Sequence, residues 1–113
     1  MIKIKTIFLV LLIIVLISGC SQQSTEEKKA AVEGNIIMIN HFVFEPSDII
    51  VDAGTAVTWK HNDNVAHTVV SPGLFESKTL SSGGEFTFTF DEPGEYSYHC
   101  SIHPSMEGKV IVR

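Results

Sequence analysis

The chain has 113 residues and a formal net charge of −5 at pH 7. An acidic surface repels the phosphate backbone, so this charge argues against a nucleic-acid-binding protein. A chain of this length suffices for one small domain, whose modest core often needs a disulfide or a metal to stabilise it. The sequence contains only two cysteines, Cys20 and Cys100.

The N-terminus has the pattern of an export signal. A short basic start precedes Ile7–Ile17, an unbroken apolar run of 11 residues. This run is shorter than the roughly 20 residues of a transmembrane helix and predicts a signal peptide. The run ends in Ile17-Ser18-Gly19-Cys20, which resembles the lipobox of bacterial and archaeal lipoproteins. The resemblance implies that residues 1–19 are removed and that lipidated Cys20 anchors the protein to the membrane. An uncleaved N-terminal helix would also place the rest of the chain in the cell envelope, outside the cytoplasm.

The polar segment after the apolar run predicts a tether. Residues 20–34 contain no aromatic residue and no apolar periodicity, so we expect a flexible connection to a domain at residues 35–113. If a lipid occupies Cys20, Cys100 has no disulfide partner. A single thiol in an exported protein requires an explanation, and a bound metal would explain it and stabilise the small core.

The pattern of the domain is all-β. Glu85–Phe90 alternates Phe with Thr, as a half-buried strand does. Other apolar or alternating runs are separated by turns that contain Gly, Pro or Asn, and no run has helical periodicity. Short strands at this spacing predict a β-sandwich. The expected strands are residues 36–39, 48–52, 56–60, 67–70, 85–90, 95–100 and 109–112.

The segment His99-Cys100-Ser101-Ile102-His103-Pro104-Ser105-Met106 carries the chemistry of interest. Residues two apart on a strand share a face, so Tyr96, Tyr98 and Cys100 are expected to face the core. His99 then faces the opposite way and is not expected to bind a metal that Cys100 binds.

The loop after Cys100 offers a thiolate, an imidazole and a thioether at the spacing Cys-x2-His-x2-Met. These soft ligands suit copper, and the blue-copper geometry takes two His, one Cys and a weak axial Met. His103 and Met106 supply one imidazole and the thioether, so a second histidine must come from elsewhere in the chain.

Three histidines are candidates for the remaining position. His67 opens an apolar strand that could reach the loop at the same end of a sandwich, and it is the favoured ligand. His61 lies among Asn and Asp residues and is expected to be a solvated turn residue. His41 precedes Phe42-Val43-Phe44 and is expected at the surface.

The ordered set of motifs resembles the small blue copper proteins, the cupredoxins of plastocyanin and amicyanin type. The resemblance extends over residues 36–112. It rests on these segments: Phe44-Glu45-Pro46, Ala53-Gly54-Thr55-Ala56-Val57-Thr58-Trp59, His67-Thr68-Val69, Phe75, Gly83-Gly84-Glu85-Phe86, Pro93-Gly94-Glu95-Tyr96-Ser97-Tyr98-His99-Cys100, and the run from Cys100 to Val110. The two-residue gaps of the loop are more similar to amicyanin than to plastocyanin.

The resemblance implies a Greek-key β-sandwich that binds one type 1 copper ion. Its ligands would be His67, Cys100, His103 and axial Met106. The chain departs from the family pattern after the first ligand, where Thr68 stands in place of Asn. Thr keeps the backbone N–H that supports the Cys sulfur but lacks the amide, which leaves ligation intact and affects the reduction potential.

The expected function is single-electron transfer between redox partners outside the cytoplasmic membrane. The protein itself would supply all four copper ligands, which leaves no open coordination position for a substrate. We therefore expect that the protein is not an enzyme. The imidazole edge of His103 would be the electron port, and the neighbouring apolar residues Ile102 and Pro104 would form the docking patch. We expect a monomer that meets its donor and acceptor transiently and binds no nucleic acid.

Other copper and cysteine chemistries fit less well. A cysteine protease needs a substrate cleft, and a binuclear copper domain needs two cysteines in the loop. The trinuclear cluster of multicopper oxidases needs His-x-His pairs, which this chain lacks. Met is a poor zinc ligand. The alternative that stays open is an extracytoplasmic copper carrier that delivers metal, although such a protein would tend to use exposed Met or His clusters.

Overall fold

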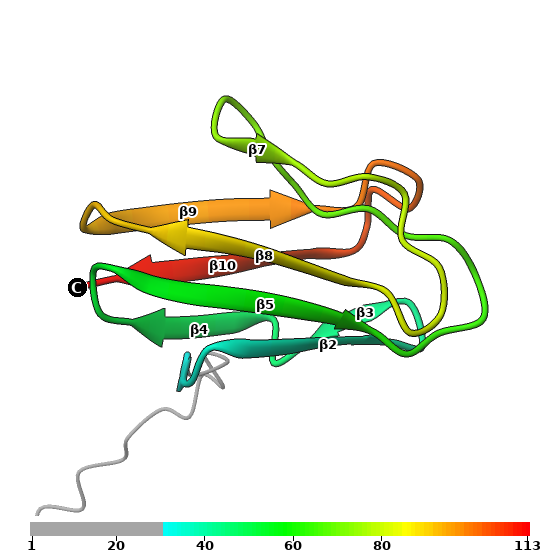
Figure 1. Cartoon of the computed structure of the whole chain (residues 1–113), viewed down its shortest axis with the longest axis horizontal. Coiled ribbons are helices and arrows are strands. Elements are labelled where there is room, and N and C mark those ends of the chain that lie inside the picture. Colours follow the sequence, from blue (N-terminus) through cyan, green and yellow to red (C-terminus); the bar gives the residue numbers. More distant parts are fainter. Residues whose placement is uncertain (1–30) are drawn as a thin grey trace, which may run out of the picture.

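The computed structural model describes residues 31–113 as a sandwich of two β-sheets (Figure 1). The predicted signal peptide at residues 1–19, Cys20 and most of the tether lie outside the described residues. Within residues 31–113, no helix is long and apolar enough to cross a membrane. The prediction of an all-β sandwich is confirmed.

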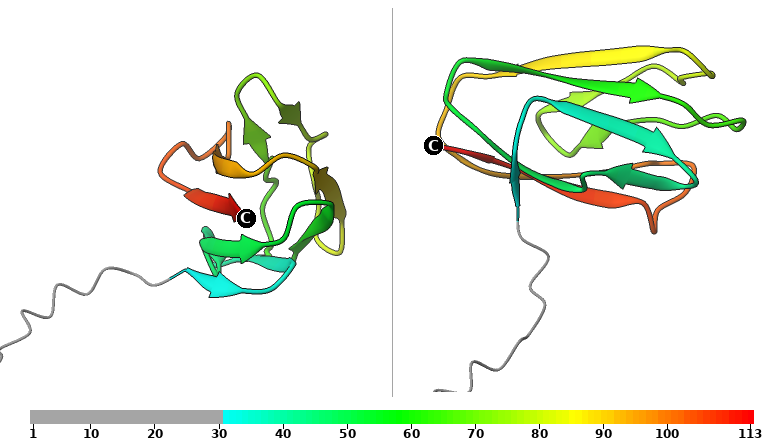
Figure 2. Two further views of the ribbon diagram at one scale, coloured as in Figure 1. Left: turned by 90° about the vertical axis from the view of Figure 1, so that its left-hand side faces the viewer. Right: turned by 90° about the horizontal axis from the view of Figure 1, so that it is seen from below.

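The two sheets are mixed, with parallel and antiparallel neighbours, and form the layers seen in Figure 2. The larger sheet contains, in spatial order, β1 (Val32–Glu33), β4 (Asp48–Val51), β10 (Glu107–Val112), β9 (Gly94–His99), β6 (Val70–Ser71) and β7 (Phe75–Glu76). The smaller sheet contains β3 (Val43–Glu45), β2 (Ile36–Asn40), β5 (Thr55–His61) and β8 (Glu85–Phe90).

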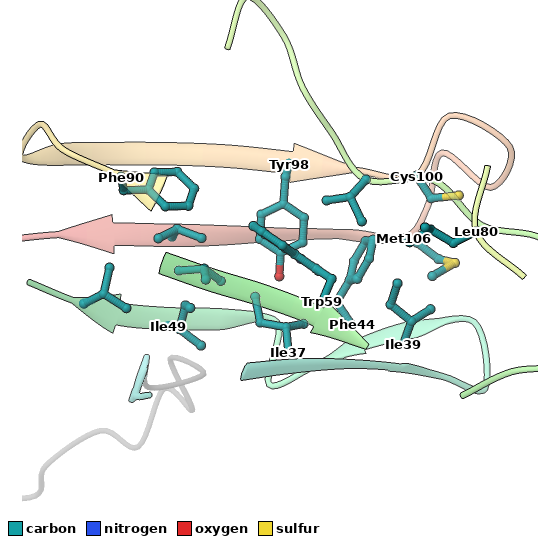
Figure 3. Close-up of a cluster of buried hydrophobic side chains, with 14 of the residues drawn as sticks. Ile37, Ile39, Phe44, Ile49, Trp59, Leu80, Phe90, Tyr98, Cys100 and Met106 are labelled. Atoms are coloured by element: carbon teal, nitrogen blue, oxygen red, sulfur yellow. The ribbon is translucent and has the colours of Figure 1, made fainter. Parts of the chain in front are cut away.

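Aromatic side chains fill the space between the sheets. Trp59 of β5 is fully buried, and its ring centroid lies 5.3 Å from that of Tyr98 on β9 and 5.7 Å from that of Phe86 on β8. The alternation predicted for β8 is confirmed, because its three Phe residues face this core while the Thr residues between them are exposed. Figure 3 shows the core running from Phe90 to Cys100 and Met106, so the sulfur-bearing residues close one end of it.

Tyr98 connects the core to the start of β4. Its hydroxyl donates a hydrogen bond to the carbonyl oxygen of Ser47 at 2.7 Å, and burial raises the pKa of this phenol, so the proton stays available for donation. Gly108 of β10 passes directly beside both groups. A Cβ at position 108 would overlap the Ser47 carbonyl oxygen and the Tyr98 hydroxyl. Only glycine therefore fits at position 108.

The strand predicted at residues 67–70 is mostly absent. Only Val70–Ser71 forms a strand there, and His67 makes an isolated bridge with Leu80. The cause is that two backbone N–H groups in this segment bond to side chains and not to a neighbouring strand. The N–H of Thr68 points at Cys100 Sγ, and that of Val69 donates to Ser77 Oγ at 2.8 Å. Side chains occupy donors that a regular sheet ladder would need.

Pairing begins before the predicted domain boundary at residue 35. β1 lies within the residues expected to form the tether, and Val32 pairs with Ile49 of β4 in a parallel arrangement. Arg113, the last residue, donates to Glu33 at 2.7 Å and to Asp52 at 3.0 Å. These contacts hold the first strand against the end of the chain.

Candidate metal centre

Three predicted ligands meet at one end of the sandwich. The ligand loop, residues 100–106, follows β9 and carries Cys100 and His103, while His67 follows the turn after β5. Cys100 Sγ lies 3.9 Å from His67 Nδ1 and 3.8 Å from His103 Nδ1, and the two nitrogens are 3.2 Å apart. One sulfur and two nitrogens thus surround a common point.

The separations of these atoms fit a single metal ion. As for zinc, metal–nitrogen bonds are roughly 2.0–2.1 Å and metal–sulfur bonds roughly 2.3 Å, so ligand atoms on one ion lie within about 4.4 Å of one another. All three measured distances satisfy this limit. His67 and Cys100 are fully buried. Two imidazoles and a thiolate with a nearby thioether are the donor set that copper prefers.

Met106 lies at the same end of the core as Cys100, and both sulfur atoms are visible in Figure 3. Its side chain is only 2% exposed. Two backbone hydrogen bonds shape the loop around it. Cys100 N donates to Met106 O at 3.0 Å, and Met106 N donates to His103 O at 2.9 Å. The chain therefore turns back tightly enough to bring the thioether to the level of the other three side chains.

The surroundings of Cys100 favour a thiolate. Burial raises the pKa of this thiol, but hydrogen bonds from the backbone N–H groups of Thr68, His103 and Ile102 act in the opposite direction, and the net pKa is lowered. The N–H of Thr68 lies 3.4 Å from the sulfur. Metal ligation requires the deprotonated form, which these N–H donors stabilise.

Thr68 also connects the two parts of the chain that carry the ligands. Its hydroxyl oxygen accepts the N–H of Ser101 at 2.9 Å and lies 2.7 Å from the Ser101 hydroxyl. A threonine hydroxyl therefore makes a side-chain link between the His67 segment and the ligand loop. Although Thr68 stands where the family pattern has Asn, its side chain still connects the His67 segment to the ligand loop.

The expectation for His61 was wrong. It is the last residue of β5, only 3% exposed, and its ring centroid is 5.1 Å from that of His67. Its Nε2 donates to the carbonyl oxygen of Val65 at 2.7 Å, and its Nδ1 accepts the N–H of Asp63 at 3.2 Å. Both ring nitrogens are engaged in holding the turn, and neither points at Cys100. His41 is exposed, as expected.

His99 faces away from the three candidate ligands. It is half-buried on the outer face of the larger sheet, where it lines an open groove together with Ser97, Glu107 and Lys109. Its cross-strand neighbour is Glu107. The predicted separation is confirmed in this respect, although the strand is one residue shorter than expected: His99 ends β9 on the outer face, and Cys100, the next residue, is buried in the core.

Two residues near the site were not expected from the sequence. Asp63 Oδ2 lies 3.0 Å from His67 Nε2, and the same oxygen accepts the backbone N–H of Phe42 at 3.0 Å. The Phe42 ring packs edge-on against His67 and His103, with centroid distances of 5.6 and 5.0 Å. Asp63 lies four residues before His67, and this short spacing could have indicated the contact between them. No feature of the neighbouring sequence indicated the contact of Phe42.

Two exposed apolar residues lie next to His103. Phe42, 48% exposed, packs its ring against the half-buried His103, and Ile102, which precedes His103 in the chain, is 46% exposed. The Nδ1 of His103 points into the site, so the opposite edge of its ring points outward. The ligand loop, residues 100–106, contains no Asp, Glu, Lys or Arg.

Comparison with known proteins places this architecture in a family. A model of the cupredoxin-like domain matches residues 8–112. The chain is 34% identical to amicyanin-alpha of Methylorubrum extorquens, and the match covers 67% of this chain and 69% of that protein. It is 45% identical to halocyanin of Natronomonas pharaonis over 65% of this chain, which spans half of that protein's length.

Solved structures agree with the sequence matches. A purple cupredoxin from Nitrosopumilus maritimus superimposes with a TM-score of 0.68 at 32% identity, covering 71% of this chain and all of the other. A mutant of amicyanin in its Cu(I) form superimposes with a TM-score of 0.66 at 28% identity, covering 69% of this chain and 80% of that one. The sandwich, the ligand-loop motif and these matches together show that the chain belongs to the cupredoxin family.

Proposed function

We propose that the protein is a type 1 copper protein that carries single electrons outside the cytoplasmic membrane. The observation that carries the proposal is the cluster of Cys100 Sγ, His67 Nδ1 and His103 Nδ1 beside the buried Met106. When bound, one copper ion would supply the Cu(I)/Cu(II) couple, and thiolate with thioether would favour Cu(I) while imidazole suits both states.

The chain's contribution is to keep these ligands still. Cys100 is anchored by Thr68, Met106 by backbone bonds to the same loop, and His67 by Asp63. Ligands that are already in place move little when the metal changes charge, and a small rearrangement favours fast electron transfer. Four protein ligands leave no position for a substrate, which supports a carrier and not an enzyme.

Burial of the ligands argues against a role in copper delivery. His67 and Cys100 are fully inaccessible, and Met106 nearly so. A protein that hands its metal to a partner needs ligands that the partner's groups can reach and replace. Here only His103 has an outward edge, which suits electron exchange through the ring and does not suit exchange of the ion.

The first prediction concerns colour. The purified protein titrated with Cu(II) should bind one equivalent and develop an intense band in the visible spectrum, because a buried thiolate donates charge to Cu(II). The measurement is an absorption titration with a redox cycle by ascorbate and ferricyanide. A colourless complex, or a band that does not disappear on reduction, would rule out a type 1 site. The hue also decides whether the centre is of the blue type or is more similar to the purple cupredoxin.

The second prediction concerns the apolar surface around His103. Replacing Ile102 with Lys should slow electron self-exchange between the Cu(I) and Cu(II) proteins by about tenfold, since two like charges then face each other where the surfaces meet. Ile102 is 46% exposed, so stability and the visible spectrum should be unchanged. Line broadening in NMR spectra of mixed oxidation states measures the rate.

A matched control is available on another part of the surface. Ile36 at the start of β2 is 45% exposed, nearly the same as Ile102, and adding Lys there changes the net charge equally. Ile36→Lys should leave self-exchange unaltered. Equal slowing by both variants would mean that overall charge matters and that Ile102 lies outside the docking patch.

We also propose that lipidated Cys20 attaches the domain to the membrane, after removal of residues 1–19. The described chain supports this arrangement by where it enters the fold. Val32 pairs with Ile49 of β4, and Ile49 is level with Val110 of β10 and Tyr96 of β9. Tyr96 precedes Cys100 by four residues. The tether thus joins the domain away from the ligands. Mass spectrometry of the mature N-terminus, with Cys20→Ala as the control, tests the anchor.

A further inference from the structure

One carboxylate links two segments of the chain at the metal centre. Asp63 Oδ2 lies 3.0 Å from Nε2 of His67 and accepts the backbone N–H of Phe42 at 3.0 Å. Asp63 Oδ1 accepts the N–H of Asn64 at 2.8 Å. The Asp63 side chain is 11% exposed and that of His67 is wholly buried. Both oxygens are thus used, and the contact with the histidine is shielded from water.

The carboxylate determines which ring nitrogen of His67 carries the proton. Both oxygens of Asp63 already accept backbone N–H groups, from Phe42 at Oδ2 and from Asn64 at Oδ1, and a carboxylate oxygen can only accept a hydrogen bond from the His67 ring. His67 must then donate from Nε2. Its Nδ1, which faces Cys100 and His103, is left with the lone pair that a metal needs.

The buried His61 holds Asp63 in place. Its Nδ1 accepts the backbone N–H of Asp63 while its Nε2 donates to Val65, two residues further along the same turn. The backbone N–H of His61 donates to Gly84 at 2.8 Å. A fully hydrogen-bonded histidine at the base of the turn explains why a polar ring is buried next to the site.

The turn at residues 41–42 depends on the same carboxylate. His41 and Phe42 have positive φ values of 49° and 60°, a region that bulky residues rarely adopt. Such a conformation persists only where surrounding contacts hold it. For Phe42 these contacts are the bond from its N–H to Asp63 and the edge-on packing of its ring against His67 and His103.

We propose that Asp63 is a positioning residue of the metal centre, which holds His67 in the tautomer that ligates through Nδ1 and holds the Phe42 turn over both histidines. The inference rests on the proposed function in that His67 is taken as a copper ligand. A negative charge hydrogen-bonded to that ligand favours Cu(II) over Cu(I). Removing it should raise the reduction potential and weaken Cu(II) binding by about 10–100-fold.

The test compares Asp63→Asn with the wild-type protein in two states. In the metal-free protein, long-range ¹H–¹⁵N NMR identifies the protonated nitrogen of His67, which should be Nε2 in the wild type and mixed or Nδ1 in the variant. In the copper-loaded protein, voltammetry should show a higher potential for Asp63→Asn. A wild-type His67 protonated on Nδ1, or a variant with unchanged tautomer, potential and affinity, overturns the proposal.

Two further variants separate position from charge and from folding. Asp63→Asn combined with Asn64→Asp moves the carboxylate by one residue at constant net charge, and it should behave like Asp63→Asn; recovery of wild-type values overturns the proposal. Phe42→Gly keeps the N–H bond to Asp63 and should keep the Nε2 tautomer, whereas its loss would show that the ring sets the tautomer. Absence of copper binding by the wild type would refute the proposed function, while the metal-free NMR result still decides the role of Asp63.

Discussion

Replacing Cys100 with Ser abolishes the visible band of the Cu(II)-loaded protein and leaves the sandwich folded. The thiolate is the only sulfur anion available within residues 31–113, and serine cannot donate charge to Cu(II) at visible energies. Removing a residue that hydrogen-bonds to a metal ligand typically lowers metal affinity by roughly 10–100-fold. The variant lacks a proposed direct ligand, so its loss of Cu(I) affinity should be larger. Absorption and circular dichroism, measured on one sample, separate loss of the centre from loss of the fold.

The matched control for this variant is the neighbouring histidine. His99 is adjacent to Cys100 in the chain but lies on the outer face of the sheet, beside Glu107. His99→Ala should keep the full band, whereas His103→Ala should weaken or shift it. A result in which His99→Ala removed the colour and His103→Ala kept it would refute the assignment of ligands from strand phase.

Replacing Gly108 with Ala should cost about 3 kcal/mol of folding free energy, as strong overpacking of a core does. For a domain of this size this lowers the melting temperature by roughly 12–24 °C. The new methyl group overlaps the Ser47 carbonyl oxygen and the Tyr98 hydroxyl, and these two groups are joined by a hydrogen bond, so neither can move away cheaply. Thermal and urea unfolding of the metal-free protein provide the measurement.

Two comparisons make this prediction specific. Gly73 has open space around its Cα, so Gly73→Ala suffers only the strain of its φ of 77°, roughly 1–2 kcal/mol. Combining Gly108→Ala with Tyr98→Phe removes one of three overlapping atoms, since the Ser47 carbonyl oxygen and the ring carbon Cζ still overlap the new methyl group. The double variant should therefore be somewhat more stable than the sum of the two single changes predicts, with only part of the cost relieved. Strict additivity would show that the hydroxyl of Tyr98 is not what excludes a side chain at position 108.

The features that the sequence revealed correctly depend on period and spacing. The alternation of residues 85–90 and 95–100 was enough to assign each side chain to a face, because a period of two admits only two choices. The same rule separated Cys100 from His99. The spacing of Cys100, His103 and Met106 on one short loop left little freedom in where their side chains could lie, which is why the cluster could be expected before it was seen.

The features that the sequence did not reveal depend on contacts between distant residues. His61 looked solvated because its neighbours are Asn and Asp, yet its ring nitrogens bind the very turn that contains them. The link between Phe42 and Asp63 joins residues 21 positions apart and has no local signature. The strand expected at residues 67–70 failed because the N–H groups of Thr68 and Val69 donate to side chains. The strand propensities of single residues do not predict whether a backbone N–H bonds to a side chain or to a neighbouring strand.

The ion pairs of Arg113 have a mechanical meaning if Cys20 holds the protein to a membrane. Any tension on the tether reaches the domain at β1, a two-residue edge strand held by β4 and by the Arg113–Glu33 contact. Load therefore passes into β4 and the C-terminus, not into the ligand loop. Under a pull, β1 is the first element to peel, and releasing residues 32–34 lengthens the tether by about 10 Å at roughly 3.3 Å per residue. The domain would extend its reach toward a distant partner without disturbing the atoms that exchange the electron.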